Sequence, residues 1–309
     1  MLVEGKWVGR FKAVQGKDAE GGFVRQPSQF RHWVGDDERF PLEAERYHLY
    51  VCMICPWACR TLAVRALLGL ETVISVSRAK PALTDQGWAF EDQGELSDPF
   101  LGAAFMHEIY THSDPHYTGR ATVPVLWDKK QRCIVNNESA DIIRMLNDQF
   151  RPLATRDLEL FPSMLADEQE RLSKHYYEQL NNGVYRAGFA TTQVAYERAV
   201  KDVFCALDEL EQRLSGRSYL LGEQLTALDI RIFVTLVRFD VAYHGAFKCN
   251  LRRIADYPNL SRYLRHLYRL PGMAETVDID AIKQGYYSIR DINPTGVVPL
   301  GPFSVAFLD

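Results

Sequence analysis

The sequence lacks the features that define several large classes of protein. Its six cysteines are scattered through 309 residues without the regular spacing of a disulfide framework. No apolar run approaches the roughly 18 residues of a membrane span, and the first residues contain no apolar signal-peptide core. We therefore expect a cytoplasmic protein in a reducing compartment, without association with a membrane.

The sequence also lacks an excess of charge of one sign. Its formal net charge is -4 with acidic and basic residues interspersed, whereas a nucleic-acid-binding protein usually shows a basic stripe. It contains no phosphate-cradling glycine loop, no internal repeat and no second cluster of metal ligands at zinc-like spacing. We expect no nucleic-acid partner and no metal, flavin or nicotinamide cofactor.

What is present is a cysteine at the junction between an apolar stretch and a helix. Residues 47–52 are nearly continuous β-formers, as in a strand covered on both faces, and Pro56 suits the first turn of a helix. The N–H groups and the positive dipole end of that helix favour a thiolate, so we predict that Cys55 is a nucleophile. Cys52 is interpreted as a small buried side chain. Cys59, one turn further along, either resolves a disulfide or packs.

The residues after Cys55 predict a thioredoxin-like half-domain. Apolar residues at i, i+4 spacing continue the helix to Gly69, which is a stop signal. Residues 73–76 form a second short strand, which completes a βαβ unit. Residues 133–135 predict a further strand, and a helix follows over residues 140–147.

A proline interrupts the β-rich run at residues 120–128. Because proline cannot donate to a strand ladder, we expect Pro124 at the beginning of a strand, with a cis bond to Val123. Val123 would then present its backbone N–H and C=O to solvent or to a ligand.

Two further positions have a structural and a functional interpretation. Glu138 and Ser139 open the helix at residues 140–147, and they either only cap it or mark a helix N-terminus that receives a carboxylate. Trp88 follows a glycine in a polar loop and is either an exposed binding platform or a cap on the core.

The second half of the chain is mainly helical. Apolar residues between Tyr196 and Leu214 keep helical spacing, and Thr226 to Asp229 form a capping box that opens another helix. Four segments are predicted: an extended N-terminal arm (1–45), an α/β domain (46–150), a linker (151–165) and a helical domain with a C-terminal tail (166–309). The aromatic residues of the arm indicate that it packs on the body of the protein: Phe23, Phe30, Trp33 and Phe40.

This order of elements resembles the glutathione transferase superfamily. A set of separated motifs narrows the resemblance to one branch, the glutathionyl-hydroquinone reductases, also called Xi-class transferases. The resemblance runs from about Gly21 to Pro302. Its motifs lie at residues 46–51, 55–58, 87–88, 114–117, 123–128, 137–139, 181–185, 188–191 and 292–296.

The resemblance implies a thioredoxin-like glutathione-binding domain followed by an all-helical glutathione transferase C-terminal domain with a quinol pocket. Cys55 matches the catalytic cysteine, and Tyr185 and Tyr286 match tyrosines that line the quinol pocket and act in catalysis. Further positions match residues that hold the co-substrate glutathione: Trp88; Arg120, at the glycyl carboxylate; Val123, by backbone pairing to the cysteinyl part; and Glu138 and Ser139, at the γ-glutamyl end. The partners implied are glutathione, glutathionyl-hydroquinones and a second copy of the chain in a homodimer.

Three functions are considered for this chain. The first is reduction of S-glutathionyl-hydroquinones through a mixed disulfide between Cys55 and glutathione. The second is an omega-like thiol transferase or dehydroascorbate reductase that uses Cys55 without the tyrosine-lined pocket. The third is a non-catalytic glutathione-binding protein. Without the resemblance, Tyr185 would be interpreted as a surface or interface aromatic and Tyr286 as a packing residue.

Overall fold

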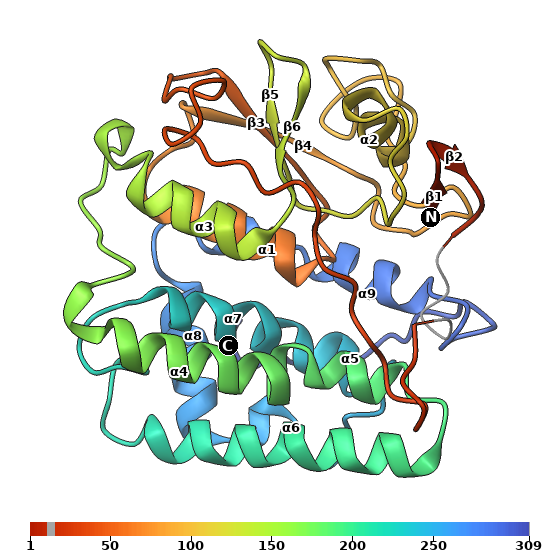
Figure 1. Cartoon of the computed structure of the whole chain (residues 1–309). Helices are drawn as coiled ribbons and strands as arrows, with labels where there is room; N and C mark the ends of the chain where they lie inside the picture. Colours follow the sequence, from red (N-terminus) through yellow and green to blue (C-terminus); the bar gives the residue numbers. More distant parts are fainter. Residues whose placement is uncertain (11–15, 309) are drawn as a thin grey trace. The chain divides into compact units, whose positions relative to one another are not determined.

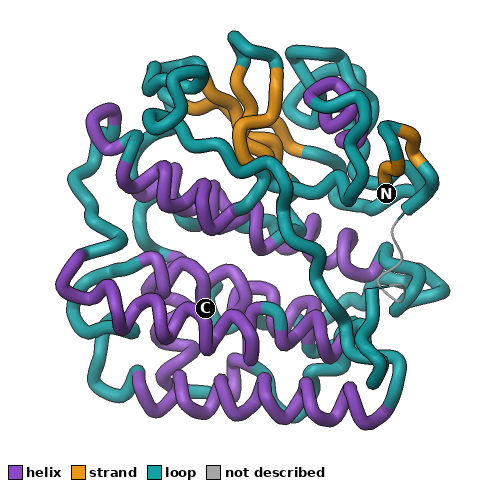
Figure 2. Tube along the Cα trace, viewed as in Figure 1, coloured by secondary structure: helices purple, strands orange, loops and turns teal. Residues whose placement is uncertain are grey.

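The structure of the protein is a computed structural model that describes residues 1–10 and 16–308. These residues form two compact units: residues 1–10 and 27–158 belong to unit 1, and residues 16–26 and 159–308 belong to unit 2. Figures 1 and 2 show the elements of both units. Residues 11–15 of the predicted arm and residue 309 of the predicted helical domain lie outside the described residues.

Unit 1 is built on a four-stranded mixed sheet with the order β4-β3-β5-β6. The central strand β3 (Tyr47–Val51) pairs in parallel with β4 (Ile74–Arg78) and antiparallel with β5 (Val125–Asp128), which pairs antiparallel with β6 (Cys133–Asn136). All five residues of β3 are buried, as predicted for a strand covered on both faces. The βαβ unit and the strand after Pro124 are therefore confirmed.

Helices α1 (Pro56–Leu67) and α3 (Ser139–Asp148) pack against each other on one face of this sheet, and α2 (Met106–Ser113) contacts β6 (Figure 1). Nearly every side chain of α1 is buried. The helix ends where the sequence predicts, because Gly69 adopts a φ of +66° that only glycine reaches without strain. A short 3-10 helix, η2 (Arg151–Leu153), follows α3.

The N-terminal arm is more structured than its irregular sequence suggests. It begins with a hairpin of β1 (Leu2–Val3) and β2 (Lys6–Trp7), which was not predicted because strands of two residues show no alternation of polarity. The turn between them has a positive φ at Glu4 and Gly5, the geometry that two-residue hairpins favour.

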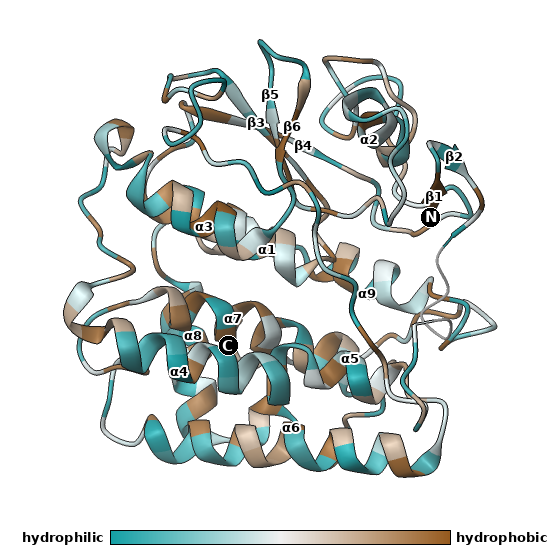
Figure 3. Cartoon of the chain, viewed as in Figure 1, coloured by the Kyte–Doolittle hydropathy of each residue, from teal (hydrophilic) through white to brown (hydrophobic). Residues whose placement is uncertain are grey.

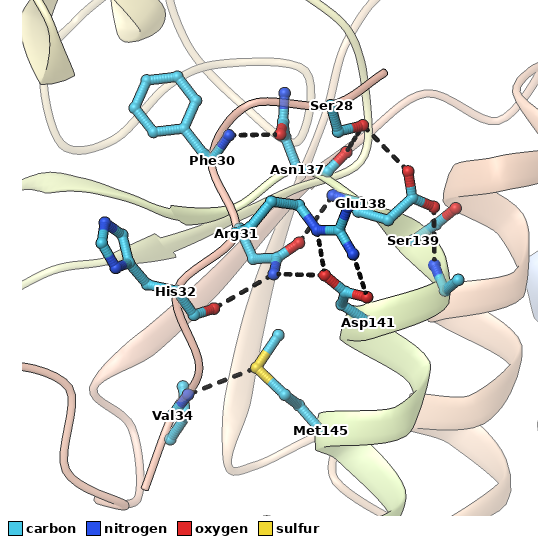
Figure 4. A network of polar contacts seen from close by, with 12 residues as sticks. Ser28, Phe30, Arg31, His32, Val34, Asn137, Glu138, Ser139, Asp141 and Met145 are labelled. Carbon is cyan, nitrogen blue, oxygen red and sulfur yellow. Dashed lines mark hydrogen bonds and ion pairs between the residues drawn. The ribbon is translucent and has the colours of Figure 1, made fainter. Parts of the chain in front are cut away.

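Residues 28–34 of the arm lie along the edge strand β6 (Figure 4). The backbone N–H of His32 donates to the carbonyl of Val135 at 3.1 Å, and the N–H of Asn137 donates to the carbonyl of Phe30 at 3.0 Å. Phe30 packs on Tyr110 and Tyr117, as the aromatic content of the arm predicted. The arm thereby covers an edge that would otherwise expose unpaired backbone groups.

Unit 2 is helical, and its longest helix, α6, covers the predicted run from Tyr196 almost to Leu214. Helix α7 (Ala227–Arg238) is buried at every position except Arg231, and Figure 3 shows hydrophobic turns along it, interrupted by hydrophilic ones. Among the described residues, no helix is both long and apolar enough to cross a membrane. The helices are α4 (Ala166–Tyr176), η4 (Tyr177–Asn181), α5 (Gly183–Gly188), α6 (Gln193–Arg213), α7 (Ala227–Arg238), η5 (Phe239–Tyr243), α8 (Pro258–Tyr268) and α9 (Ile279–Tyr287), with short turns η3 (Ser163–Leu165), η6 (Ile254–Asp256) and η7 (Ala274–Thr276).

The predicted capping box at the start of α7 is present, and its acidic residue is fully buried. The Asp229 carboxylate accepts hydrogen bonds from the N–H and hydroxyl of Thr226, both at 2.8 Å, from the N–H of Leu220 at 2.9 Å and from the hydroxyl of Tyr263 at 2.8 Å. Asp229 therefore joins the start of α7 to a neighbouring loop and to α8.

We expect Asp229→Ala to lower the free energy of unfolding by about 3 kcal/mol, because the substitution leaves several buried donors without an acceptor. Urea denaturation followed by circular dichroism measures the change. Glu197→Ala, on the exposed face of α6, is the control and should change stability by less than about 0.5 kcal/mol. Equal stabilities for the two variants would show that the Asp229 contacts do not contribute to folding.

Candidate active site

Cys55 lies at the N-terminus of α1 in unit 1. It is the N-cap residue, with extended backbone angles (φ -79°, ψ 117°), and Pro56 occupies the first helical position. Cys55 is half-buried, whereas Cys52 and Cys59 are fully buried. Cys55 therefore stands at the N-terminal end of α1, where a helix favours negative charge.

The sulfur of Cys55 also contacts the loop that contains Val123. The distance from Sγ of Cys55 to the carbonyl oxygen of Val123 is 3.5 Å. The peptide bond between Val123 and Pro124 is cis, as predicted, and Pro124 directly precedes β5. Unit 1 thus brings together two of the predicted site residues from segments far apart in the sequence.

Glu138 and Ser139 form the N-terminus of α3. The Glu138 carboxylate accepts a hydrogen bond from the N–H of Ala140 at 3.1 Å, so the capping interpretation holds for Glu138. Ser139 is buried, and its hydroxyl oxygen accepts from Nε and Nη2 of Arg60 at 3.0 and 2.6 Å. The N-terminus of α3 therefore lies next to the guanidinium of Arg60, which helix capping alone does not require.

Arg60 was not predicted from the sequence. It is only 3% exposed, its Nη2 lies 3.5 Å from the Glu138 carboxylate, and its guanidinium stacks over the Trp57 ring at 5.1 Å. Buried arginine is rare, and a cation beside a helix N-terminus creates a site that attracts an anion. The only signal in the sequence is a charged residue in the first half of α1, five positions after Cys55, where the neighbouring residues are apolar or small.

The N-terminal arm holds the α3 N-terminus from the other side (Figure 4). The hydroxyl of Ser28 lies 3.0 Å from the Glu138 carboxylate and 3.2 Å from the carbonyl of Asn137. The guanidinium of Arg31 forms a two-point ion pair with Asp141, in the first turn of α3. The orientation of Glu138 is therefore determined by residues about 110 positions earlier in the chain.

A buried tyrosine hydroxyl links the Val123 loop to the α3 N-terminus. The hydroxyl of Tyr110 donates to the carbonyl of Thr122 at 2.9 Å and accepts from the side-chain amide of Asn137 at 3.0 Å. Burial raises the pKa of Tyr110, so its hydroxyl stays protonated at neutral pH. Tyr110 thereby fixes the spacing between two predicted parts of the site.

Trp88 and Arg120 lie on loops of unit 1. Trp88 is half-exposed and follows Gly87, whose φ of +80° closes a tight turn. A Cβ atom at Gly87 would lie 3.3 Å from the ring of Trp7, so the N-terminal hairpin packs closely on this turn. Arg120 is half-buried, and its carbonyl accepts a hydrogen bond from Tyr117 at 3.2 Å. Both residues are partly exposed to solvent.

The two predicted tyrosines of unit 2 are in direct contact, and a third joins them. The hydroxyl oxygens of Tyr185 and Tyr286 are 2.6 Å apart, and those of Tyr243 and Tyr286 are 3.0 Å apart. We call Tyr185, Tyr243 and Tyr286 the tyrosine cluster. Burial raises the pKa of Tyr243 and Tyr286 well above the ordinary value, whereas Tyr185 is half-exposed. The two buried members of the cluster are therefore neutral phenols at neutral pH, and Tyr185 is its half-exposed member.

Irregular helical turns place two members of this cluster. The π-helical turn η5 ends at Tyr243. The π-helical turn η4 ends at Asn181, four residues before Tyr185, which is the third residue of α5. Such turns are rare and often occur at functional sites, because the extra residue rotates the side chains that follow. Tyr243 carried no signal in the sequence, since its role depends on the distant Tyr286.

Within the part of the chain that the structure describes, no group of three or more histidine, cysteine, aspartate or glutamate side chains is placed to hold a metal ion. The groups available for chemistry are a thiol and a cationic helix end in unit 1 and three phenols in unit 2. A thiol at a helix N-terminus on a thioredoxin-like sheet, followed by an all-helical unit, defines a glutathione transferase.

Comparisons with known proteins agree with this class. Residues 54–149 match the family described as "Glutathione S-transferase, N-terminal domain", and residues 193–266 match "Glutathione S-transferase, C-terminal domain". The chain is 48% identical over 304 residues to the glutathionyl-hydroquinone reductase PcpF of Sphingobium chlorophenolicum, covering 98% of this chain and 96% of PcpF. The chain therefore belongs to the glutathionyl-hydroquinone reductases, the Xi class of glutathione transferases.

Solved structures support this assignment. The chain resembles the glutathione-S-transferase Xi from Phanerochaete chrysosporium with a TM-score of 0.90 and 46% identity, covering 93% of this chain and 95% of that one. It resembles the glutathione-bound structure of YqjG from Escherichia coli K-12 with a TM-score of 0.87 and 47% identity, covering 90% and 94%. The predicted fold class, a thioredoxin-like domain followed by a helical C-terminal domain, is confirmed.

Proposed function

We propose that this protein reduces S-glutathionyl-hydroquinones to hydroquinones, with glutathione as co-substrate. The observation that carries the proposal is the half-buried thiol of Cys55 at the N-terminus of α1, in contact with the Val123 loop, in a chain of the glutathionyl-hydroquinone reductase family. A thiol in this position is the group that can accept a glutathionyl sulfur. We also propose that the protein acts as a cytoplasmic homodimer that needs no metal, flavin or nicotinamide.

The proposed reaction has two steps, and atoms and electrons are conserved in each. In the first, the hydroquinone ring converts to its keto tautomer, in which a ring hydroxyl has lost a proton and the ring carbon bearing the sulfur has gained one, and the Cys55 thiolate attacks the glutathionyl sulfur. The carbon–sulfur bond breaks, its electron pair leaves with the ring as an enolate, and a Cys55–glutathione disulfide forms; the enolate oxygen then takes up a proton to give the hydroquinone. In the second step, the thiolate of another glutathione attacks this disulfide, which releases glutathione disulfide and restores Cys55.

The tyrosines of unit 2 supply hydrogen-bond donors in this proposal. A developing enolate oxygen is stabilised by donors that are already oriented toward it, and neutral phenols serve this purpose. Burial keeps the hydroxyl of Tyr286 protonated, and Tyr185 is the half-exposed end of the tyrosine cluster. We therefore assign Tyr185 and Tyr286 to the quinol and Cys55 to the sulfur.

Glutathione is assigned to unit 1. In this assignment Val123 pairs through its backbone with the cysteinyl part, Arg120 receives the glycyl carboxylate, Trp88 covers the tripeptide, and Glu138 and Ser139 hold the γ-glutamyl end. The buried cation Arg60 and the N-terminus of α3 favour the carboxylate of that end. Residues 46–150 then form the glutathione-binding domain and residues 166–309 the domain with the quinol pocket, joined by residues 151–165.

We expect Arg60→Met to weaken glutathione binding about tenfold or more, because it removes a charge that supports both the α3 N-terminus and the bound carboxylate. Isothermal titration of glutathione into the Cys55→Ser background measures the affinity without turnover. Arg144→Met, which breaks an exposed ion pair with Asp148 on the same α3, is the control and should leave the affinity unchanged. Unchanged affinity in Arg60→Met would remove Arg60 from the binding site.

The proposed function is tested by comparing substrates. The protein is given a glutathionyl-hydroquinone with glutathione, and hydroquinone and glutathione disulfide are measured by chromatography, in parallel with dehydroascorbate and a small mixed disulfide. Hydroquinone release much faster than the other two reactions supports the proposal. Turnover of dehydroascorbate or the mixed disulfide alone supports the omega-like alternative, and glutathione binding without any turnover supports the non-catalytic one.

A further inference from the structure

A cation from the N-terminal arm lies against the face of one member of the tyrosine cluster. The guanidinium carbon of Arg25 is 5.0 Å from the centroid of the Tyr185 ring and 5.5 Å from that of Phe23, within the range of a cation–π interaction. Nε of Arg25 donates to the side-chain oxygen of Asn182 at 3.1 Å, three residues before Tyr185. Arg25 is thus held by the same segment whose ring it covers.

The segment that carries Arg25 is anchored within unit 2. The hydroxyl of Thr192 donates to the carbonyl of Glu20 at 2.9 Å, and Arg198 forms an ion pair with the Glu20 carboxylate at 2.6 Å. Phe23 is buried and packs on Phe189, with ring centroids 5.6 Å apart. These contacts place Arg25 at a defined position over Tyr185.

Tyr185 is the member of the tyrosine cluster that such a cation affects most directly. Its hydroxyl contacts Tyr286, which contacts Tyr243, so polarisation of Tyr185 is passed along the cluster. The fully buried Arg238 affects the two buried members of the cluster. Burial raises the pKa of Tyr243 and Tyr286, and the positive charge of Arg238 opposes part of that rise. The positive charge of Arg238 therefore also acts on the buried members of the cluster.

We propose that Arg25 is a positioning residue for the reaction, whose positive charge over the Tyr185 ring strengthens the hydrogen bond that Tyr185 donates to the oxygen anion forming on the hydroquinone. The inference rests on the proposed function. A cation on the face of the ring is attracted more strongly as negative charge develops on the phenol oxygen, so its effect grows toward the transition state. This stabilisation is selective for the quinol step, because the thiol exchange at Cys55 develops no charge on a phenol.

The test uses two variants that separate charge from shape. Arg25→Gln keeps a donor for Asn182 but loses the charge, and Arg25→Lys keeps the charge. We expect Arg25→Gln to lower kcat for the glutathionyl-hydroquinone about tenfold, with exchange of a small mixed disulfide unchanged, and Arg25→Lys to retain most of the activity. Arg253→Met, which breaks an exposed ion pair with Asp256 elsewhere in unit 2 and contacts neither Arg25 nor the tyrosine cluster, is the control and should resemble the wild type.

A double-mutant cycle distinguishes this role from a general structural one. In the Tyr185→Phe background, Arg25→Gln should cause no further loss, because its effect passes through the Tyr185 hydroxyl. The inference is overturned if Arg25→Gln keeps the wild-type kcat, if it causes the same loss in both backgrounds, or if Arg25→Lys is as impaired as Arg25→Gln. A wild-type protein that does not turn over the glutathionyl-hydroquinone overturns the proposed function as well, whereas an active wild type with an unaffected Arg25→Gln overturns this inference alone.

Discussion

Cys55→Ser should abolish the release of glutathione disulfide, with a loss of at least about a thousandfold, because a serine hydroxyl is not ionised at neutral pH and cannot attack the glutathionyl sulfur. The N-cap position of Cys55 favours the ionised form of a side chain, but this effect is too small to ionise an alcohol, whose pKa is much higher than that of a thiol. The measurement is intact-mass analysis after a glutathionyl-hydroquinone is added without excess glutathione. Wild-type protein should gain one glutathione, and Cys55→Ser should gain none.

Two other cysteines bear on this result, Cys205 as a control and Cys59 as a possible partner of Cys55. Cys205 is exposed on α6, and Cys59 is buried on α1. Cys205→Ser should form the adduct as the wild type does, which shows that exposure alone does not make a thiol reactive. Adduct formation by Cys55→Ser would contradict the assignment of the nucleophile. A wild-type product that carries an internal Cys55–Cys59 bond instead of glutathione would mean that Cys59 resolves the intermediate.

Tyr286→Phe should lower the rate of hydroquinone release by about a hundredfold, while exchange of a small mixed disulfide at Cys55 is retained. Tyr286 is the centre of the tyrosine cluster, and removal of one donor to a developing oxyanion typically costs this much. Tyr185→Phe should have an effect of similar size, because its hydroxyl lies 2.6 Å from that of Tyr286 and Tyr185 is the half-exposed member of the cluster. Steady-state kinetics with both substrates measure the two activities.

Tyr287→Phe is the matched control, since Tyr287 is the next residue on α9 and lies outside the cluster. Its hydroxyl lies where a Cβ atom at Gly245 would be, which indicates a packing role. Tyr287→Phe should therefore keep hydroquinone release close to the wild-type rate. Equal losses of hydroquinone release and disulfide exchange in Tyr286→Phe would indicate a general structural defect, whereas unchanged hydroquinone release would remove Tyr286 from the proposed reaction.

The local elements of unit 1 were predictable because their signals lie within short stretches of sequence. The strand before Cys55, the end of α1 at Gly69 and the cis bond before Pro124 follow from local rules on burial, φ angles and missing N–H groups. The capping box of α7 was predictable for the same reason, because Thr226 and Asp229 are three residues apart.

The parts of the site that were missed depend on contacts between distant residues. Arg60 reaches Ser139, Ser28 reaches Glu138, and Tyr243 reaches Tyr286 across 79, 110 and 43 positions. Nothing near any of these residues in the sequence marks its partner. The hairpin at the N-terminus was missed for a different reason, since its strands are too short to show a period.

The sequence by itself determined where the proposed nucleophile lies and which elements surround it, because a helix start, a strand and a turn are determined by the residues that form them. Only the tertiary structure decided which charges and hydroxyl groups lie next to one another. The buried guanidinium of Arg60 contacts the start of α3, the three tyrosine hydroxyls form a hydrogen-bonded series, and Arg25 covers the ring of Tyr185. The physical reason is that hydrogen bonds and ion pairs act over a few ångströms, so folding must first bring distant residues within that range.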